Sequence, residues 1–234
     1  MFPLKDKPPK MMEDKTEKIK EDEEESRRLI IGYDYVDFDR YFYQTLLTVF
    51  IIRFGWTMTF GELCHHPDQN WQGLEIAYTL AYGDEVENIH TWEWQDRYTL
   101  RSSLYPIYLS IPLHILRFFK IDYNVLVVNS MFLMNTFIIV IGDYYLYLIS
   151  KTYMGKRGAA IALLWTLFNY RINQIFLKTL TNGVESVFCT VAFYYFSLLK
   201  PKFDKNMALM TFSITMAFIA RSSSLVGFLP IAIY

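Results

Sequence analysis

The chain has 234 residues, of which 53% are hydrophobic and 18% aromatic, and its formal net charge is −1. A near-neutral chain offers no strongly basic surface, so we expect no nucleic-acid partner. The two cysteines, Cys64 and Cys189, lie in different contexts, which argues against a disulfide framework and leaves no CxxC pair for zinc.

Charge is concentrated at the N-terminus, where residues 1–40 hold 21 of the 47 Lys, Arg, Asp and Glu side chains. Mixed-charge blocks such as Glu21–Glu25 cannot bury enough apolar area to offset chain entropy. We therefore predict a disordered cytosolic tail at 1–40. The remaining residues, 41–234, are dilute in charge and suit a bilayer better than water.

A first membrane span is predicted from about Tyr43 to Phe60. Its length is about 18 residues, which just crosses a hydrocarbon core of ~30 Å. Arg53 lies within it, and an intramembrane arginine should face protein, water or a headgroup rather than lipid. Either a structural role or a ligand contact would satisfy that requirement.

An acidic segment follows, because residues 61–101 carry a balance of −6. Leu74, Ala77, Tyr78 and Ala81 recur at helical spacing, which predicts a short amphipathic helix after Pro67. Two further motifs follow in this acidic part of the chain, Thr-Trp-Glu-Trp at 91–94 and Arg-Ser-Ser-Leu-Tyr-Pro at 101–106.

The topology is predicted from charge parity, that is, from the number of spans that places all the basic loops on one side of the membrane. Two basic clusters, one at 151–157 and one at 200–205, separate later apolar stretches, and short basic loops favour the cytosolic side. If Leu104–Phe119 is interfacial or re-entrant rather than spanning, both clusters and the tail share one side. We prefer that interpretation, which makes 61–124 the first lumenal loop. Segments 171–185 and 221–224 then lie on the same lumenal face.

Asp68 follows Pro67 where an apolar span gives way to the loop. Its carboxylate can act as a general base on a hydroxyl, or it can mark the start of a helix. Cys64, His65 and His66 precede it and suggest a metal site, but adjacent histidines rarely point the same way and no third partner stands at ligand spacing. We therefore predict no metal.

Asp143 lies deep in an apolar stretch, where an ionisable group is a functional candidate unless it pairs with another charge such as Arg53. Four other polar residues lie at the ends of apolar stretches. The lysine and the arginine among them either extend to the membrane interface or bind an anionic phosphate. The four are Lys178, Asn182, Glu185 and Arg221.

Six motifs together carry a family resemblance. The run HPDQNWQGLEIAYTLAYG, then TWEW, RSSLYP, GDYYLY, KTLTNGVES and AFIARSSS, resembles the dolichol-phosphate-mannose-dependent mannosyltransferases of the endoplasmic reticulum (ER). Among them it most resembles the members that add the third mannose to the glycosylphosphatidylinositol (GPI) core. The resemblance implies an all-α, polytopic membrane fold of the GT-C type, with the active site in the first lumenal loop.

The resemblance also implies the chemistry. Mannose would pass with inversion from dolichol-phosphate mannose to a GPI glycolipid, with Asp68 as catalytic base and without a resident cofactor, although a divalent metal stays possible. Lys178 and Arg221 would stabilise the departing phosphate. The remaining substrate-binding residues that we predict are Gln69, Trp71, Gln72, Glu75, Trp92, Glu93, Trp94, Arg101, Asp143, Asn182 and Glu185.

Three departures from the family pattern are visible: Gln69 replaces a glutamate, Lys178 an arginine and Ser222 a proline. If the missing glutamate is the base, the protein is weak or inactive. The family is about twice as long, so we expect this chain to cover its N-terminal half. Two alternatives remain: a related ER mannosyltransferase, for the fourth GPI mannose or the N-glycan precursor, or a truncated membrane protein that binds without catalysis.

Overall fold

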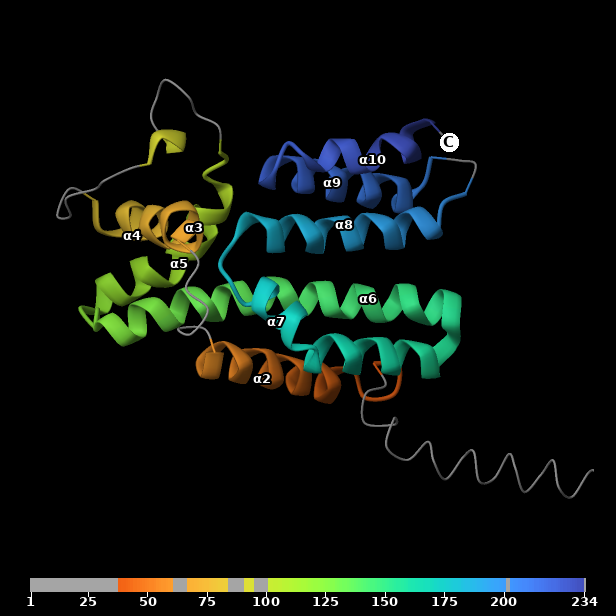
Figure 1. Ribbon diagram of the computed structural model, residues 1–234, viewed down its shortest axis with the longest axis horizontal. Coiled ribbons are helices and arrows are strands. Elements are labelled where there is room, and N and C mark those ends of the chain that lie inside the picture. The colour runs from red at the N-terminus through yellow and green to blue at the C-terminus, as the bar shows by residue number, and fades with distance from the viewer. Residues whose placement is uncertain (1–37, 61–66, 84–90, 95–100, 201–202, 234) are drawn as a thin grey trace, which may run out of the picture. The chain divides into compact units, whose positions relative to one another are not determined.

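A computed structural model describes residues 38–60, 67–83, 91–94, 101–200 and 203–233 (Figure 1). Every regular element in these ranges is helical. The all-α class is therefore confirmed for the described part of the chain. The chain divides into two units, residues 1–45 and 46–234, and residues 1–37 of the tail predicted at 1–40 lie outside the described residues.

Only the end of the first unit is described. It contains the start of helix α2 (Phe42–Phe60), where the Thr45 amide donates to the Tyr41 carbonyl at 2.9 Å. The Phe38 and Phe42 rings lie 5.9 Å apart between centroids. These contacts are local, so they fix the first turns of α2 and nothing further along the chain.

The longest element of the second unit is α6 (Asn124–Phe168), which reverses direction at Gly155. Gly155 has φ 72° and ψ −180°, a conformation that a residue with a Cβ rarely adopts. Figure 1 shows the two halves running side by side in opposite directions. The two apolar stretches predicted on either side of the 151–157 basic cluster are thus two arms joined by a tight turn.

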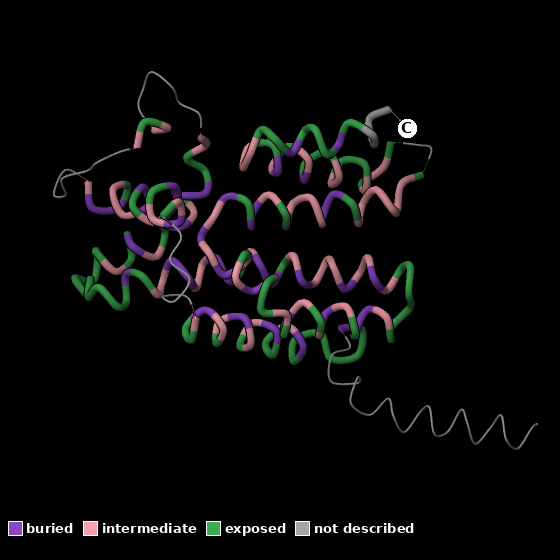
Figure 2. Tube along the Cα trace, in the orientation of Figure 1, coloured by how far each residue is buried: buried purple, intermediate pink, exposed green. Residues whose placement is uncertain are grey.

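Helices α8 (Thr181–Ser197), α9 (Lys205–Ala220) and α10 (Ser224–Ile233) continue the bundle beside α6. The contact between α6 and α8 is close, since a Cβ on Gly142 would lie 2.7 Å from a methyl carbon of Val187. Many outward side chains are nevertheless large and apolar (Figure 2). Such a surface suits lipid or further helices better than water.

A second group of helices lies at one end of this bundle. Short helix α3 (Pro67–Gln69), the π-helical turn η3 (Asn70–Leu74) and α4 (Glu75–Tyr82) run on from one another, and α5 (Leu104–Phe119) packs against α4 and α6. Arg117 of α5 donates to the Ala81 carbonyl at 2.5 Å and lies over the Tyr82 ring. Burial, with Asp122 nearby, raises the pKa of Tyr82.

The two basic turns, at Gly155 and between α8 and α9, lie at the same end of the bundle, opposite the polar motifs (Figure 1). The assignment of these ends to the cytosolic and lumenal sides stays a prediction. Among the described helices, only α6 is long and apolar enough to cross a membrane, while α5 and α9 are shorter apolar helices. The other spans stay predictions.

Candidate active site

The segment from Pro67 to Tyr82 is helical, as predicted. Proline suits the first turn of a helix because its missing N–H has no intrahelical acceptor there, and the Asp68 carboxylate lies in that turn, near the positive end of the helix dipole. Gln69 and Gln72 point inward and are buried, whereas Trp71 and Glu75 are exposed. Gly83 ends α4 with φ 63°.

Gly73 brings this helical segment against the Lys178–Asn182 motif. A Cβ at position 73 would lie 2.8 Å from the carbonyl oxygen of Thr179, closer than real Cβ contacts come. The backbone of η3 therefore packs directly on the segment between α7 (Tyr170–Phe176) and α8. No local sequence pattern indicates this role, because the two positions are distant along the chain.

We predict that Gly73→Ala lowers the free energy of unfolding by about 1–3 kcal/mol, because backbone rather than a flexible side chain must move to admit the methyl group. Gly55→Ala is the matched control, since nothing lies within 4 Å of its added Cβ in α2. Denaturant unfolding of both variants in detergent measures the difference. Equal stability of the two variants would show that the Gly73 contact is not made.

Arg101 joins two of the other motifs. Its guanidinium binds both oxygens of Glu93, at 2.6 and 3.1 Å, and donates to the Thr181 hydroxyl at 3.4 Å. Glu93 lies in the 3-10 turn η5 (Trp92–Trp94), and Thr181 begins α8. Trp92 is exposed, while the indole N–H of Trp94 is buried and finds no partner among the described residues.

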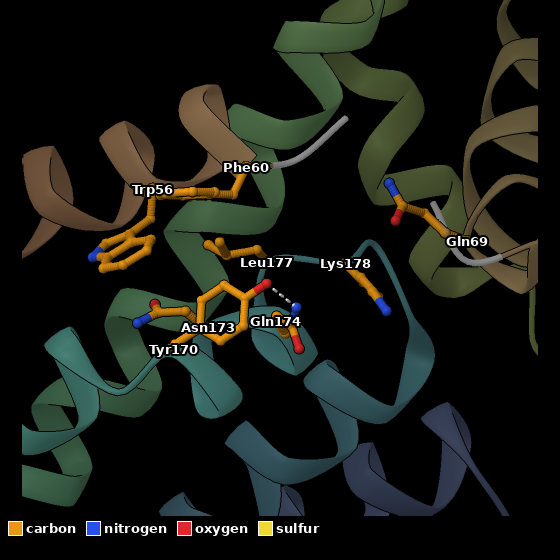
Figure 3. A pocket seen from close by; sticks show the side chains of 8 residues that line it. All are labelled: Trp56, Phe60, Gln69, Tyr170, Asn173, Gln174, Leu177 and Lys178. Atoms are coloured by element: carbon orange, nitrogen blue, oxygen red, sulfur yellow. Dashed lines mark hydrogen bonds between the residues drawn. The ribbon is translucent and has the colours of Figure 1, made fainter. Parts of the chain in front are cut away.

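Lys178 and Gln69 both line a small pocket between α2, α3 and α7 (Figure 3). Its volume is about 10 Å³, which is about the space that one water needs. Gln69 is 3% exposed, and its carbonyl oxygen has no partner among the described residues. Two of the three departures from the family pattern therefore line the same pocket.

Arg221 and Glu185 form a third contact at the same end. Arg221 Nε lies 3.7 Å from a Glu185 carboxylate oxygen, and the Ser223 hydroxyl lies 3.5 Å from the other oxygen. The arginine side chain is 36% exposed, so the pair is open to solvent or ligand. Asn182, one turn before Glu185, is exposed at the start of α8.

An apolar groove of about 390 Å³ opens between α5, α6, α8 and α9. Ser102 and Thr181 are polar residues in its wall, and Thr181 is the residue that Arg101 contacts. The rest of the wall is formed almost entirely by apolar side chains. They are Leu104, Tyr105, Ile107, Tyr108, Ile111, Ile138, Val184, Phe188, Met216, Ile219 and Ala220.

Asp143 does not reach this end. Its two carboxylate oxygens accept from Arg53, at 2.6 and 2.8 Å, and both residues are buried. The remaining Arg53 nitrogen donates to Asn173 Oδ1 at 2.5 Å and to the Thr166 carbonyl at 3.4 Å. The pairing that the sequence left open is therefore formed, and it joins α2, both arms of α6 and α7.

The three segments that were predicted to be lumenal, 61–124, 171–185 and 221–224, thus have residues that meet at one end of the bundle. They meet through the contacts of Arg101, Lys178 and Arg221. Cys64, His65 and His66 lie outside the described residues. Among the residues that are described, no three His, Cys, Asp or Glu side chains could hold a metal together. Sequence reasoning missed Gly73, Asn135, Asn173 and Thr181; the two asparagines were visible as amides in apolar surroundings.

The class of protein is now defined: an all-helical bundle with an apolar exterior and a polar, Trp- and Arg-bearing site at one end. The chain belongs to the Alg9-like mannosyltransferase family, which it matches over residues 44–234. No solved structure matches it.

Curated relatives carry consistent names. The chain is 28% identical to mannosyltransferase APTG1 of Arabidopsis thaliana over 58% of this chain and 24% of that protein. It is 27% identical to GPI alpha-1,2-mannosyltransferase 3 of Bos taurus, over 70% of this chain and 29% of the relative. GPI mannosyltransferase 3 of Schizosaccharomyces pombe is 26% identical, with 64% and 29% covered. The matched region thus spans less than a third of each relative.

Proposed function

We propose that the protein transfers mannose from dolichol-phosphate mannose to a GPI glycolipid at the lumenal face of the ER membrane, adding the third mannose in α-1,2 linkage. Family membership and the names of the relatives support mannosyl transfer. The observation that carries the assignment to this site is the Arg101 contact, which joins the Trp-Glu-Trp turn to the start of α8.

The proposed reaction is one displacement. The acceptor hydroxyl oxygen bonds to C1 of mannose while the bond from C1 to the phosphate oxygen breaks, and dolichol phosphate leaves with the electron pair. The transition state resembles an oxocarbenium ion, as in glycoside hydrolysis. Asp68 takes the proton of the acceptor hydroxyl. A β-linked donor then gives an α-linked product.

The cationic side chains act on the departing phosphate in this proposal. Lys178 supplies a half-buried ammonium beside Gln69, and Glu185 orients Arg221, whose guanidinium stays accessible. Arg101 is already bound to Glu93, so it holds the Trp92 and Trp94 turn in place rather than binding the phosphate. The Trp92 face is exposed and offers an apolar surface to a pyranose.

The apolar groove beside Thr181 suits the hydrocarbon part of the donor, because an isoprenoid chain needs an apolar wall next to a polar site for its phosphate. Asp143 has no part in this mechanism, since Arg53 occupies both of its oxygens.

Complementation tests the proposal. Expression in cells that lack the third GPI mannosyltransferase should restore surface GPI-anchored proteins and remove the accumulated two-mannose glycolipid. Cells blocked at the fourth GPI mannose, or at the N-glycan precursor, should not be restored. Rescue of one of those lines instead would reassign the acceptor. Failure in all three, with the protein present in the ER, would favour a binding protein without catalysis.

A further inference from the structure

A buried amide in the first arm of α6 contacts the predicted phosphate-binding segment. Asn135 is 2% exposed, and its Oδ1 accepts from the Tyr105 hydroxyl at 2.9 Å. Its Nδ2 lies 3.3 Å from the carbonyl oxygen of Phe176 and 3.4 Å from those of Leu177 and Lys178. The side chain thus joins the first turn of α5 to the end of α7.

These contacts bring a donor to backbone carbonyls at the end of α7. The last carbonyls of a helix lack intrahelical donors, and α7 ends at Phe176. Burying an amide such as Asn135 without partners is also costly. Only one orientation of the amide serves both sides, because the carbonyls need N–H donors and the tyrosine hydroxyl can donate to the oxygen.

The other face of the same segment is also fixed. The Thr179 carbonyl oxygen lies against Gly73, and the Leu180 amide donates to the Lys178 carbonyl at 2.7 Å. The backbone around Lys178 is therefore held from α6 on one side and from η3 on the other. That backbone carries Lys178, which lines the same pocket as Gln69.

We propose that Asn135 is a positioning residue, which holds the 176–178 backbone so that Lys178 meets the leaving phosphate. The inference rests on the proposed mannosyl transfer. Negative charge grows on the phosphate in the transition state. A displaced ammonium therefore reduces the stabilisation of the transition state more than it reduces the binding of the donor. Loss of Asn135 should consequently lower kcat and leave KM for the donor within about threefold.

Three variants test the role. Asn135→Leu removes both the donor and the acceptor, and Tyr105→Phe removes only the hydroxyl that donates to Asn135. Asn206→Leu is the matched control, because that amide also lies near a backbone carbonyl, 3.4 Å from that of Leu198, but at the other end of the bundle. Because Asn135→Leu leaves buried polar groups without partners, we predict a fall in kcat of about 10–100-fold for this variant. We predict a smaller fall for Tyr105→Phe.

Two measurements on the purified protein in lipid nanodiscs distinguish a local positioning role of Asn135 from general destabilisation. One is mannose transfer from dolichol-phosphate mannose per folded molecule, and the other is amide hydrogen exchange of residues 176–181. We expect faster exchange in that segment for Asn135→Leu, with α8 and α9 unchanged, and no change in the segment for Asn206→Leu.

Unchanged exchange at 176–181 overturns the positioning role, and so does a uniform rise over the whole protein, which indicates general destabilisation. A local rise without any loss of kcat also overturns it. If the unmodified protein transfers no mannose while Asn135→Leu still raises exchange locally, the Asn135 contact stands and the proposed function fails.

Discussion

Asp68→Asn is expected to abolish mannose transfer, with a loss of at least about 10²–10⁴-fold in microsomes supplied with dolichol-phosphate mannose. The amide keeps the shape of the side chain in the first turn of α3 but cannot take the acceptor proton. Asp122→Asn is the matched control, because this exposed carboxylate lies in the turn between α5 and α6. Transfer by Asp68→Asn within severalfold of the unmodified protein would exclude Asp68 as the base.

Gln69→Glu tests the competing assignment at the neighbouring position. The introduced carboxylate would lie in the pocket that Lys178 also lines, where it should pair with the ammonium rather than activate a hydroxyl. We therefore expect no gain in transfer rate from this variant. A gain of tenfold or more would indicate that the family glutamate is the base and that Gln69 has weakened this protein.

The second large effect concerns stability. Arg53→Met should lower the free energy of unfolding by about 3–5 kcal/mol, because it leaves the Asp143 carboxylate buried without its partner. Asp143→Leu should cost a similar amount by stranding the guanidinium. The double variant should lose less than either single variant, about 1–3 kcal/mol, because Asn173 Oδ1 still loses its donor.

Arg171→Met is the control for this series, since Arg171 is exposed on α7 and its replacement should change stability by no more than about 0.5 kcal/mol. Denaturant unfolding in detergent supplies all four values. Strict additivity of the two single changes would contradict a direct contact between Arg53 and Asp143.

Charge distribution predicted one feature of the architecture. The acidic loop and the basic clusters predicted that the polar motifs gather at one end, because loop charge follows the side of a membrane; the side itself stays a prediction. The cost of an unpaired charge in an apolar stretch likewise suggested a partner for Asp143, and Arg53 was the candidate named. Both inferences depend on composition and burial alone, which a sequence states directly.

Contacts between distant segments were beyond the sequence. Nothing in the local pattern connects Gly73 to the Thr179 carbonyl or Asn135 to the end of α7, since each contact depends on how helices pack. The pairing of Arg101 with Glu93 likewise depends on packing, and the proposed mechanism uses it to support the Trp92–Trp94 turn. The assignment of the proton acceptor rests on resemblance and on the place of Asp68 in α3.

Transfer of labelled mannose tests the central claim most directly. Microsomes that contain the protein, but no other third GPI mannosyltransferase, would receive dolichol-phosphate mannose labelled in the sugar and a GPI acceptor with two mannoses. The account predicts a three-mannose product whose new residue is released by an α-1,2-specific mannosidase, and no product with Asp68→Asn. Absence of that product from the unmodified protein, with donor and acceptor both present and the protein folded in the membrane, would contradict it.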